Sequence, residues 1–377
     1  MPEVVIVGAG PVGTATAIGL VERGVDVAVL ERRRQPETGS RSIGIHPPAL
    51  AVLERLGCAE AMIDAGVRIR RGEVRRRGRL LGELSFQTAS PRHPYVLSLP
   101  QQATERILRA RLDAVAPGAL RTDWEATGVR RHGKTMRLET SRGPLDADWI
   151  VAADGPHSVL RDADGIAMRV RRYPDRYAMG DATDETGLGD AAVLYLEEAG
   201  VVESFPMPGG LRRWVVHRGA DPAPLDAPGL AALVRRRTGV VLDPGSIAPT
   251  STFGIRHVWT PTTVRGRLIL AGDAAHEISP IGGQGMTLGW LDAAQLVPAL
   301  ADVIGGAGPA ALSAYRLDAA RRQRIAARQA HFNTVMGRPR RGIPLAARDL
   351  LVRTIARPAF ERRLARAFTM AAPAAVR

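Results

Sequence analysis

Apolar and polar positions along the first thirty residues follow a pattern that predicts a strand, a helix and a second strand. Residues 4–7 are all apolar, residues 11–23 carry apolar side chains at helical spacing, and residues 27–30 form another short apolar run. A short buried strand followed by a helix and a second such strand is typical of a parallel βαβ unit. We therefore expect the chain to open with this unit.

The remainder of the chain alternates between helix-like and strand-like segments. Helical spacing predicts helices over residues 47–56, 101–115, 284–300, 310–336 and 346–370. Short apolar runs predict strands over residues 80–86, 95–97, 149–153 and 268–271. Alternating strands with turn signals fill residues 169–258, most clearly as a hairpin of residues 201–207 and 211–217 around Pro208, Gly209 and Gly210. The order places nucleotide-binding elements on both sides of a β-rich insertion.

Size and composition indicate an ordinary folded protein. The 377 residues exceed the size at which one core usually stays undivided, so we expect two closely joined domains. A hydrophobic fraction of 45% and a charged fraction of 24% lie near the averages of soluble globular chains. No window approaches about eighteen consecutive apolar residues, and the first residues lack a secretory signal, so we expect a cytoplasmic protein. Cys58 is the single cysteine, which excludes a disulfide within the chain.

The formal net charge of +14 comes almost wholly from arginine, since Lys134 is the only lysine. The arginines are dispersed and no known nucleic-acid-binding module is present, so we expect no nucleic-acid partner. Steering of a polyanionic cofactor such as NADPH is another use of this charge. Residues 346–370 mix apolar side chains with arginines, which leaves open a peripheral contact with an anionic membrane beside simple packing on the protein. We expect a monomer or a homodimer.

A glycine-rich turn follows the first strand. It reads Gly8-Ala9-Gly10-Pro11-Val12-Gly13, and Glu31 ends the next strand. Gly8 permits a tight turn, Gly10 lets the backbone approach a pyrophosphate, and Gly13 allows close helix packing. Glu31 has nearly the usual spacing for a carboxylate that accepts hydrogen bonds from ribose hydroxyls. The turn predicts a dinucleotide site without separating FAD from NAD.

A second turn, Asp154-Gly155-Pro156-His157-Ser158, follows the apolar strand at residues 149–153. Asp154 can order the turn, Gly155 can take a left-handed conformation, and Ser158 and Arg161 recur on one helical face. Alone, this turn is commonplace and mostly structural.

The third motif follows the apolar strand at residues 268–271. It comprises Gly272-Asp273-Ala274-Ala275-His276, then Pro280, then Gly282-Gly283-Gln284-Gly285-Met286-Thr287. This run resembles the Gly-Asp motif of single-component flavoprotein monooxygenases of the p-hydroxybenzoate hydroxylase-like (aromatic hydroxylase) family, and the second turn resembles that family's Asp-Gly motif. All three motifs occur in the family's order, and the resemblance covers roughly residues 4–330.

The resemblance implies an α/β fold with a Rossmann-like FAD-binding domain, an inserted β-rich substrate domain and C-terminal helices. The implied FAD-binding parts are residues 1–72, 101–168 and 261–335, the substrate-domain parts are residues 73–100 and 169–260, and a helical segment covers residues 336–377. The implied cofactor-binding residues are Gly8, Gly10, Pro11, Val12, Gly13, Glu31, Arg32, Arg41, Gln101, Asp154, Gly272, Asp273, Pro280, Gly283, Gln284, Gly285, Met286 and Thr287.

Residue chemistry supports the third motif independently. Asp273 is a candidate acceptor for the hydroxyls of the ribityl chain, and residues 284–287 would present N–H groups at a helix N-terminus to an anionic flavin. Thr287 departs from the family's usual Asn, and the usual second Pro near Ser279 is missing. Thr can still donate a hydrogen bond to a carbonyl, so we expect flavin binding to survive these departures.

The implied reaction is oxygen transfer. NADPH or NADH reduces FAD, the reduced flavin captures dioxygen as a C4a-hydroperoxide, and the distal oxygen hydroxylates or epoxidises an aromatic, quinone-like or polyketide-like molecule, as in secondary metabolism. A dry pocket is required. Tyr195, Phe205, Met207, Trp214, Val216 and Phe253 are candidate pocket residues because alternation along their strands would put several of them on one face, although plain core packing is the more common explanation for each one separately.

Candidate catalytic residues are fewer. Arg41 matches the family's arginine near the flavin and the substrate entrance, and His217, Tyr195 or His46 could help to deprotonate a phenol. The histidines lack ligand partners at metal-binding spacing, so we expect no metal.

Three alternatives remain at this stage. A flavin-dependent halogenase would need a Trp-x-Trp-x-x-Pro-type motif and an early lysine, which the chain lacks. A flavoprotein reductase or dehydrogenase of isoprenoid or other lipophilic substrates uses the same fold without oxygen transfer and is the principal alternative. The third is a binding protein, either one that retains FAD as a structural element or an arginine-rich protein that binds a membrane or nucleic acid.

Overall fold

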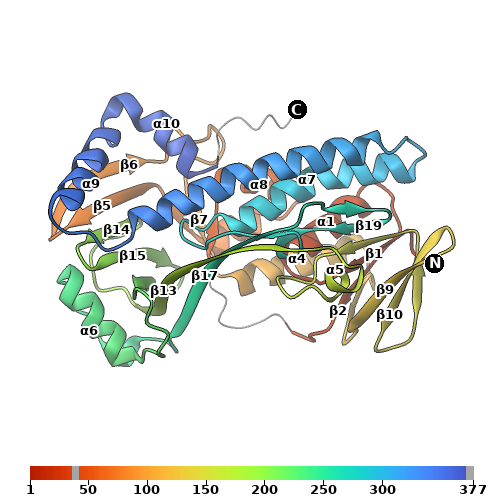
Figure 1. Cartoon of the computed structure of the whole chain (residues 1–377), viewed down its shortest axis with the longest axis horizontal. Helices are drawn as coiled ribbons and strands as arrows, with labels where there is room; N and C mark the ends of the chain where they lie inside the picture. The colour runs from red at the N-terminus through yellow and green to blue at the C-terminus, as the bar shows by residue number, and fades with distance from the viewer. Residues whose placement is uncertain (36–41, 371–377) are drawn as a thin grey trace.

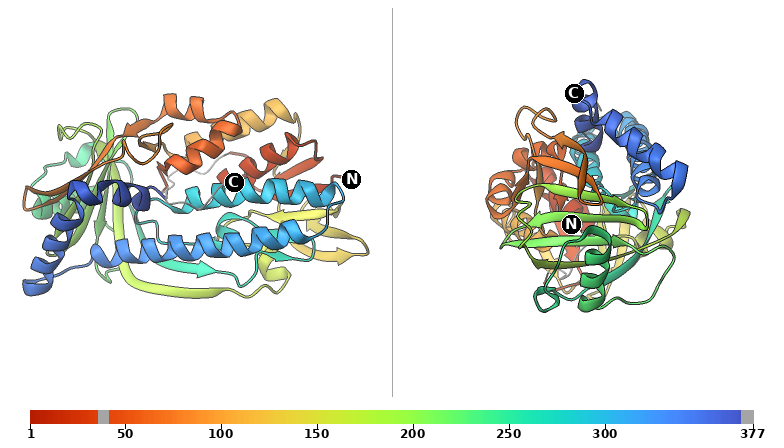
Figure 2. Two further views of the ribbon diagram at one scale, coloured as in Figure 1. Left: turned by 90° about the horizontal axis from the view of Figure 1, so that it is seen from above. Right: turned by 90° about the vertical axis from the view of Figure 1, so that its left-hand side faces the viewer.

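Two large sheets lie toward opposite ends of the molecule, and long helices run along both of them (Figure 1). The structure is a computed structural model that describes residues 1–35 and 42–370. The long strands β13 and β17 extend from the eight-stranded sheet toward the six-stranded one (Figures 1 and 2).

The six-stranded sheet carries the opening βαβ unit. Five of its strands are parallel, and only the edge strand β18 is antiparallel. Val4 and Ile6 of the first strand face three helices, while Val5 and Val7 face a small sheet and a fourth helix. The three helices are α1 (Pro11–Val21), α4 (Gln101–Val115) and α7 (Gly285–Ile304), and the fourth is α5 (Val159–Ala163). The central strands β1, β12 and β19 are therefore buried on both faces, which explains their all-apolar sequences. In spatial order the strands are β18 (Val264–Arg265), β19 (Leu268–Leu270), β12 (Trp149–Ala152), β1 (Val4–Val7), β2 (Val27–Glu31) and β8 (Leu120–Thr122).

The eight-stranded sheet is mostly antiparallel, and it contains the expected hairpin as β15 and β16. Its strands, in spatial order, are β20 (His276–Glu277), β17 (Ser251–Trp259), β13 (Arg169–Thr183), β16 (Leu211–His217), β15 (Gly200–Met207), β14 (Ala192–Glu197), β5 (Arg71–Arg76) and β6 (Arg79–Ser85). Two smaller sheets complete the β-structure. They are β11 (Leu145–Ala147), β10 (Thr135–Thr140) and β9 (Ala126–His132), and β3 (Gly44–Ile45), β7 (Val96–Ser98) and β4 (Val67–Ile69).

The two faces of the eight-stranded sheet have different neighbours. The outer face packs against helix α6, which carries Leu230 and Val234. The inner face packs against Ile281, in the loop of the third motif, and against Val352 of helix α9. The inner face is thus the side turned toward the three glycine motifs.

Ten helices are described. They are α1 (Pro11–Val21), α2 (Pro47–Arg55), α3 (Ala59–Ala65), α4 (Gln101–Val115), α5 (Val159–Ala163), α6 (Ala227–Thr238), α7 (Gly285–Ile304), α8 (Ala310–Met336), α9 (Gly342–Ile355) and α10 (Pro358–Phe368). Single 3₁₀ turns cover Pro244–Ser246 and Gly272–Ala274. Helices α7 and α8 run side by side over the molecule (Figures 1 and 2).

Two sequence-based expectations about helices are wrong. The single helix expected over residues 346–370 is two helices, because the residue before Pro358 is pushed into an extended conformation (Arg357, ψ 147°). Helix α6 lies inside the segment expected to be all strand, where Asp226 caps its first turn and Gly239 ends it at φ +79°.

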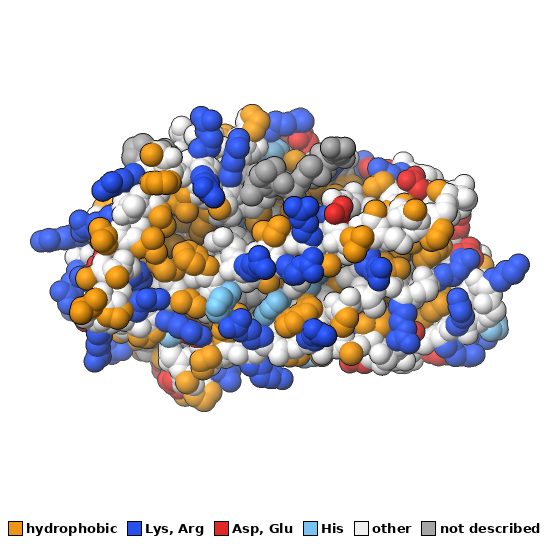
Figure 3. All heavy atoms as spheres, turned by 45° about the horizontal axis from the view of Figure 1, so that its top comes forward, with side chains coloured by type: hydrophobic (Ala, Val, Ile, Leu, Met, Phe, Trp, Pro, Cys, Tyr) orange, Lys and Arg blue, Asp and Glu red, His pale blue; other side chains and the backbone are white. Residues whose placement is uncertain are grey.

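On one face of the molecule, charge is spread and not gathered into a single patch (Figure 3). On the face shown in Figure 3, arginine side chains are scattered among apolar ones. Leu350 and Phe360 of the C-terminal helices stay exposed, so the peripheral membrane contact remains a prediction. In residues 1–35 and 42–370, no helix combines the length and apolar character needed to cross a membrane.

Candidate functional site

The first glycine turn has the geometry that its sequence requires. Gly8 takes φ +103°, and a Cβ atom there would lie 2.3 Å from the carbonyl oxygen of Ala153, at the second motif. A Cβ at Gly13 would lie 2.1 Å from the carbonyl oxygen of Gly8. At Gly10, by contrast, a Cβ would meet nothing within 4 Å. The turn is therefore tight against the protein at Gly8 and Gly13 and open to a ligand at Gly10.

Glu31 lies buried beside this turn. Its carboxylate accepts hydrogen bonds from the N–H groups of Ala9 and Arg33, each over 2.9 Å. Burial opposes the charge, but these hydrogen bonds and the Arg33 side chain lower the pKa of Glu31 below its usual value. The neighbouring Arg32 is exposed. Glu31 is thus held as a carboxylate, with lone pairs left for ribose hydroxyls.

The second motif is joined to the third by a buried arginine. Gly155 takes φ +84°, and the Ser158 hydroxyl accepts from the N–H of Arg161 over 3.1 Å at the start of α5. The Arg161 side chain is 1% exposed and donates to the carbonyl of Ala274 over 3.3 Å. This contact fixes the third motif against the second.

The third motif is also joined to the first. The indole N–H of Trp290 in α7 donates to the carbonyl of Pro11 over 2.9 Å. Val12 packs against Gly272 and Gly289, where Cβ atoms would approach its side chain to 3.2 Å and 2.4 Å. All three motifs therefore meet at the carboxyl ends of the parallel strands, where such sheets bind ligands.

Asp273 follows strand β19 within this meeting point. Solvent reaches its side chain, yet desolvation by the surrounding protein raises the pKa of Asp273 to about 6. Both observations fit a carboxylate that is surrounded by protein atoms but keeps part of its surface open to solvent. Such a group can accept hydrogen bonds from a polyol.

A buried ion cluster lies close to Asp273 and includes His276, whose charge acts on the Asp273 carboxylate. His276 Nε2 lies 2.6 Å from Asp292 Oδ2, and Arg322 donates to Asp292 Oδ1 over 2.7 Å. Burial acts against a charge on His276, but the hydrogen bond and charge of Asp292 raise the pKa of His276 above its usual value. The cluster ties β20 to α7 and α8.

The loop between β20 and α7 turns sharply at two glycines. Gly282 has φ +96° and Gly283 has φ +66°, while Pro280 is exposed. Gln284 follows at the N-terminus of α7, with its side chain buried. Residues 285–287 form the first turn of α7, so their N–H groups point out of the helix end toward the motifs. This end can stabilise negative charge.

The two departures from the family pattern have structural partners. The Thr287 hydroxyl accepts from the N–H of His46 over 3.3 Å, and Met286 beside it is largely buried. The Ser279 hydroxyl lies 3.2 Å from that of Thr334 in α8. His46 Nε2 lies 3.1 Å from the carbonyl of Gly282, and burial lowers the pKa of His46 to about 4. His46 is therefore neutral near pH 7.

Helix α4 presents a polar face to the first motif. Gln101 donates to Glu105 over 2.8 Å, and Arg109 donates to the carbonyl of Ala9 over 3.4 Å. The sequence indicated Gln101 but missed Glu105 and Arg109. Steps of four residues along the helix, from Gln101 to Glu105 and on to Arg109, were the available signal, since they place all three on one helical face.

Unsatisfied buried atoms surround the meeting point of the motifs. Five of them have no hydrogen-bond partner among the described residues: Glu105 Oε2, Arg109 Nε, Asp154 Oδ1, Gln284 Oε1 and His46 Nδ1. Buried polar atoms normally have partners, so a polar ligand is expected here. The residues present fit FAD, whose pyrophosphate, ribityl and ring parts offer many donors and acceptors. Arg41 lies outside the described residues.

The expected pocket residues divide between the two faces of the eight-stranded sheet. Phe205, Met207 and Phe253 lie on the inner face. Tyr195 and Trp214 stack on each other under α6, on the outer face with Val216. The expectation that Tyr195, Trp214 and Val216 line a pocket near the cofactor is wrong, because the pleat turns them away from it.

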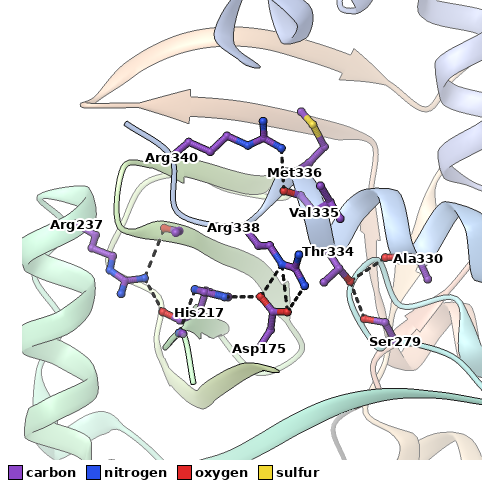
Figure 4. Close-up of polar contacts among 12 residues, drawn as sticks. Asp175, His217, Arg237, Ser279, Ala330, Thr334, Val335, Met336, Arg338 and Arg340 are labelled. Atoms are coloured by element: carbon purple, nitrogen blue, oxygen red, sulfur yellow. Dashed lines mark hydrogen bonds and ion pairs between the residues drawn. The ribbon is translucent and has the colours of Figure 1, made fainter. Parts of the chain in front are cut away.

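His217 is held in an internal cluster at the end of β16. Its Nε2 atom lies 2.9 Å from Asp175 Oδ1, its Nδ1 accepts from the N–H of Gly219 over 3.2 Å, and Asp175 also pairs with Arg338 over 2.7 Å (Figure 4). Burial lowers the pKa of His217 despite Asp175. Both ring nitrogens are engaged, which contradicts the expected role of His217 in deprotonating a substrate. Among the described residues, no group of three acidic, histidine or cysteine side chains could hold a metal.

Comparison with known proteins gives one family and a set of similar enzymes. Residues 1–331 match the model of a family described as an FAD binding domain. A 6-methylpretetramide 4-monooxygenase from Streptomyces rimosus is 33% identical over 331 residues, which cover 81% of this chain and 56% of that protein. The chain thus spans little more than half the length of this curated relative.

Two solved structures have the same fold. The p-nitrophenol 4-monooxygenase PnpA from Pseudomonas putida superposes with a TM-score of 0.89 at 24% identity, covering 97% of this chain and 96% of that one. The anhydrotetracycline hydroxylase OxyS from Streptomyces rimosus gives a TM-score of 0.81 at 26% identity, covering 98% of this chain and 76% of that one.

Proposed function

Because the chain belongs to the FAD binding domain family, we propose that it is an FAD-dependent monooxygenase. Its substrate is an aromatic, quinone-like or polyketide-like small molecule, which it hydroxylates or epoxidises, and NADPH or NADH supplies the electrons. The names of similar proteins, which include monooxygenases of a pretetramide, an anhydrotetracycline and p-nitrophenol, support this class of reaction. The expected α/β fold and the aromatic-hydroxylase resemblance are confirmed.

The observation that carries the proposal is the convergence of three distant motifs at the carboxyl ends of the parallel strands. Gly10 offers open backbone for the pyrophosphate, Glu31 and Asp273 offer carboxylates for sugar and ribityl hydroxyls, and α7 directs its N-terminus at the same place. Bound FAD would accept hydride from the nicotinamide and deliver one atom of dioxygen to the substrate, while the other atom leaves as water.

The protein's own contribution at the flavin end is electrostatic. N–H groups of the first turn of α7 stabilise negative charge, and His46 adds no positive charge because it is neutral at pH 7. His46 instead holds the carbonyl of Gly282 and, through its own N–H, the hydroxyl of Thr287. These two contacts hold the loop between β20 and α7 next to His46, which directly follows strand β3.

The substrate lies between this loop and the inner face of the eight-stranded sheet. Phe205, Met207 and Phe253 supply apolar surface there, and Met207 reaches the hydroxyl of Ser98 in β7 over 3.8 Å. Apolar walls keep water from the reacting atoms, which oxygen transfer requires.

Turnover in labelled dioxygen tests the proposal. The FAD-loaded protein should oxidise NADPH or NADH faster when a phenolic or polyketide-like substrate is added, and the product should contain one labelled oxygen. Substrate oxidation without label would establish a dehydrogenase instead. Parallel runs with NADPH and NADH decide between the two reductants.

A further inference from the structure

Glu203 is a buried carboxylate in apolar surroundings. It lies on the inner face of β15 and is 5% exposed. The strand register pairs it with Leu194 on β14 and Val215 on β16, and Val201 and Phe205 flank it on the same face because side chains alternate along a strand. Its immediate neighbours on the sheet are therefore all apolar.

Within residues 1–35 and 42–370, Glu203 has neither a hydrogen-bond nor an ion-pair partner, and burial alone raises the pKa of its carboxyl group to about 7. Other buried acids of this sheet are paired. Glu73 accepts from Arg75 over 2.7 Å, Glu197 from the N–H of Arg77 over 2.8 Å, and Asp175 from Arg338 over 2.7 Å. Glu203 thus stands apart from acids whose role is to hold the sheet.

A buried polar group without a partner destabilises a fold unless something satisfies it. Glu203 faces the side where the cofactor motifs lie. Met207 is four residues further along the same face, about 13 Å at the usual rise of a strand, and contacts Ser98. Ser98 pairs with Gly44, which lies against Gly283 of the α7 loop. A ligand lying along β15 therefore reaches from the flavin loop toward Glu203.

Charged groups elsewhere on the inner face are already neutralised. Arg213 makes two hydrogen bonds to Asp181, over 2.7 Å and 2.8 Å. At the other end, Asp175 is shared by His217 and Arg338. Tyr177 lies on the same face, between the Asp175 cluster and Glu203. Burial raises the pKa of Tyr177, so it stays a neutral phenol. Glu203 is consequently the carboxyl acceptor that this face offers to a ligand, beside the hydroxyl of Tyr177, which also has no hydrogen-bond partner among the described residues.

We propose that Glu203 selects the substrate, accepting a hydrogen bond from a hydroxyl or N–H group on an aromatic ligand and excluding ligands that carry a carboxylate at that position. A hydroxyl satisfies the buried oxygen atoms, whereas a second carboxylate would face a like charge in apolar surroundings. The inference rests on the proposed function only for the position of the substrate beside β15, and it does not depend on turnover.

Binding of three matched probes to the FAD-loaded protein without NADPH or NADH tests this inference. The probes are naphthol, its methyl ether and naphthoate, measured by equilibrium dialysis. Wild-type protein should bind naphthol roughly tenfold to a hundredfold more tightly than either other probe, as expected for one hydrogen bond to a charged or strongly polar acceptor. E203L should lose the preference for naphthol over its ether.

A second variant separates hydrogen bonding from charge. E203Q keeps a carbonyl acceptor and removes the acid, so it should still bind naphthol and should bind naphthoate more tightly than wild type does. E83Q, at an exposed glutamate of the same sheet, should behave as wild type. The inference is overturned if wild-type protein binds the three probes equally or not at all, or if E203L keeps the wild-type order. Because binding is measured without turnover, the binding result can be interpreted even if the monooxygenase assay fails.

Discussion

The side-chain amide of Gln284 donates a hydrogen bond to the backbone carbonyl of Phe368 over 3.1 Å, which fastens the end of α10 to the beginning of α7. The Phe368 ring stacks on Phe86 with centroids 5.8 Å apart and meets the edge of His46 at 6.4 Å. The end of α10 therefore closes one side of the space between the flavin loop and the eight-stranded sheet.

Removal of the Phe368 ring should open this space to water. We expect F368A to retain FAD but to release more hydrogen peroxide per NAD(P)H oxidised, because water reaches the site of oxygen transfer. The measurement is the ratio of peroxide to NAD(P)H consumed in the presence of substrate. F360A is the matched control, since Phe360 lies on the same helix and is 46% exposed. An unchanged ratio in F368A would show that α10 plays no part in closing the site.

Loss of the Asp273 carboxylate should weaken FAD binding strongly. D273A removes the acceptor placed for the ribityl hydroxyls, whereas H217A alters a cluster whose hydrogen bonds go to Asp175, Gly219 and Arg338 and not to the three motifs. Flavin absorbance after gel filtration should therefore fall in D273A and stay at the wild-type level in H217A. Equal flavin content in the two variants would contradict the placement of the cofactor.

The buried Glu203 should make stability depend on pH. Its folded pKa of about 7 exceeds the ordinary value of 4.5, so the folded state holds the proton more tightly and stability falls as pH rises between these values. E203Q should be more stable than wild type above pH 7, by at most about 3 kcal/mol, and the gain should shrink toward pH 4.5. Urea unfolding at several pH values measures this. Tyr177 and the Asp175 cluster are present in both proteins, so their contributions to the pH dependence cancel in the stability difference. A stability gain of E203Q that did not change with pH would refute the expectation.

The buried pair at Asp292 should be needed for folding stability. D292N leaves Arg322 buried without its counter-charge, at an expected loss of about 3 to 5 kcal/mol. The raised pKa of His276 adds a pH dependence: its contribution is complete below the unfolded value of 6.5 and is lost as pH rises through the folded value. The gap between wild type and D292N should therefore narrow with rising pH in thermal unfolding of the FAD-free proteins. D318N, at an exposed position of α8, is the control; the same loss in both variants would exclude a specific role for the pair.

The glycine motifs could be recognised in the sequence because each depends on local geometry. Gly8 needs a positive φ and has no room for a Cβ beside Ala153, and Gly155 and Gly283 also take positive φ. Only glycine meets these requirements, so it occurs at a fixed position after a buried strand. The fold and the type of cofactor could be predicted because three such motifs occur in the order typical of the family.

The substrate side could not be predicted in the same way. Alternation along β15 and β16 separates two sets of side chains, but it does not say which set faces the cofactor. Trp214 and Tyr195 are as apolar as Phe205, and only the packing of α6 assigns them to the far face. Glu203 was overlooked because an acidic residue in a strand usually indicates solvent.

Contacts between distant residues were also beyond sequence reasoning. Thr287 looked like a weakened flavin contact, and its partner at His46 lies 241 positions away. The break at Pro358 was missed although the residue itself gives the signal, because helical spacing of apolar residues continues across it.

The link from Arg161 to the Ala274 carbonyl spans 113 positions, and the link from Trp290 to Pro11 spans 279. A site assembled from such separated segments requires long loops to close before it exists, so it forms slowly and late in folding. FAD then meets a nearly finished chain and binds the native state rather than the unfolded one, shifting the unfolding equilibrium by mass action. The supply of flavin after synthesis should therefore influence how much of this protein stays folded and accumulates.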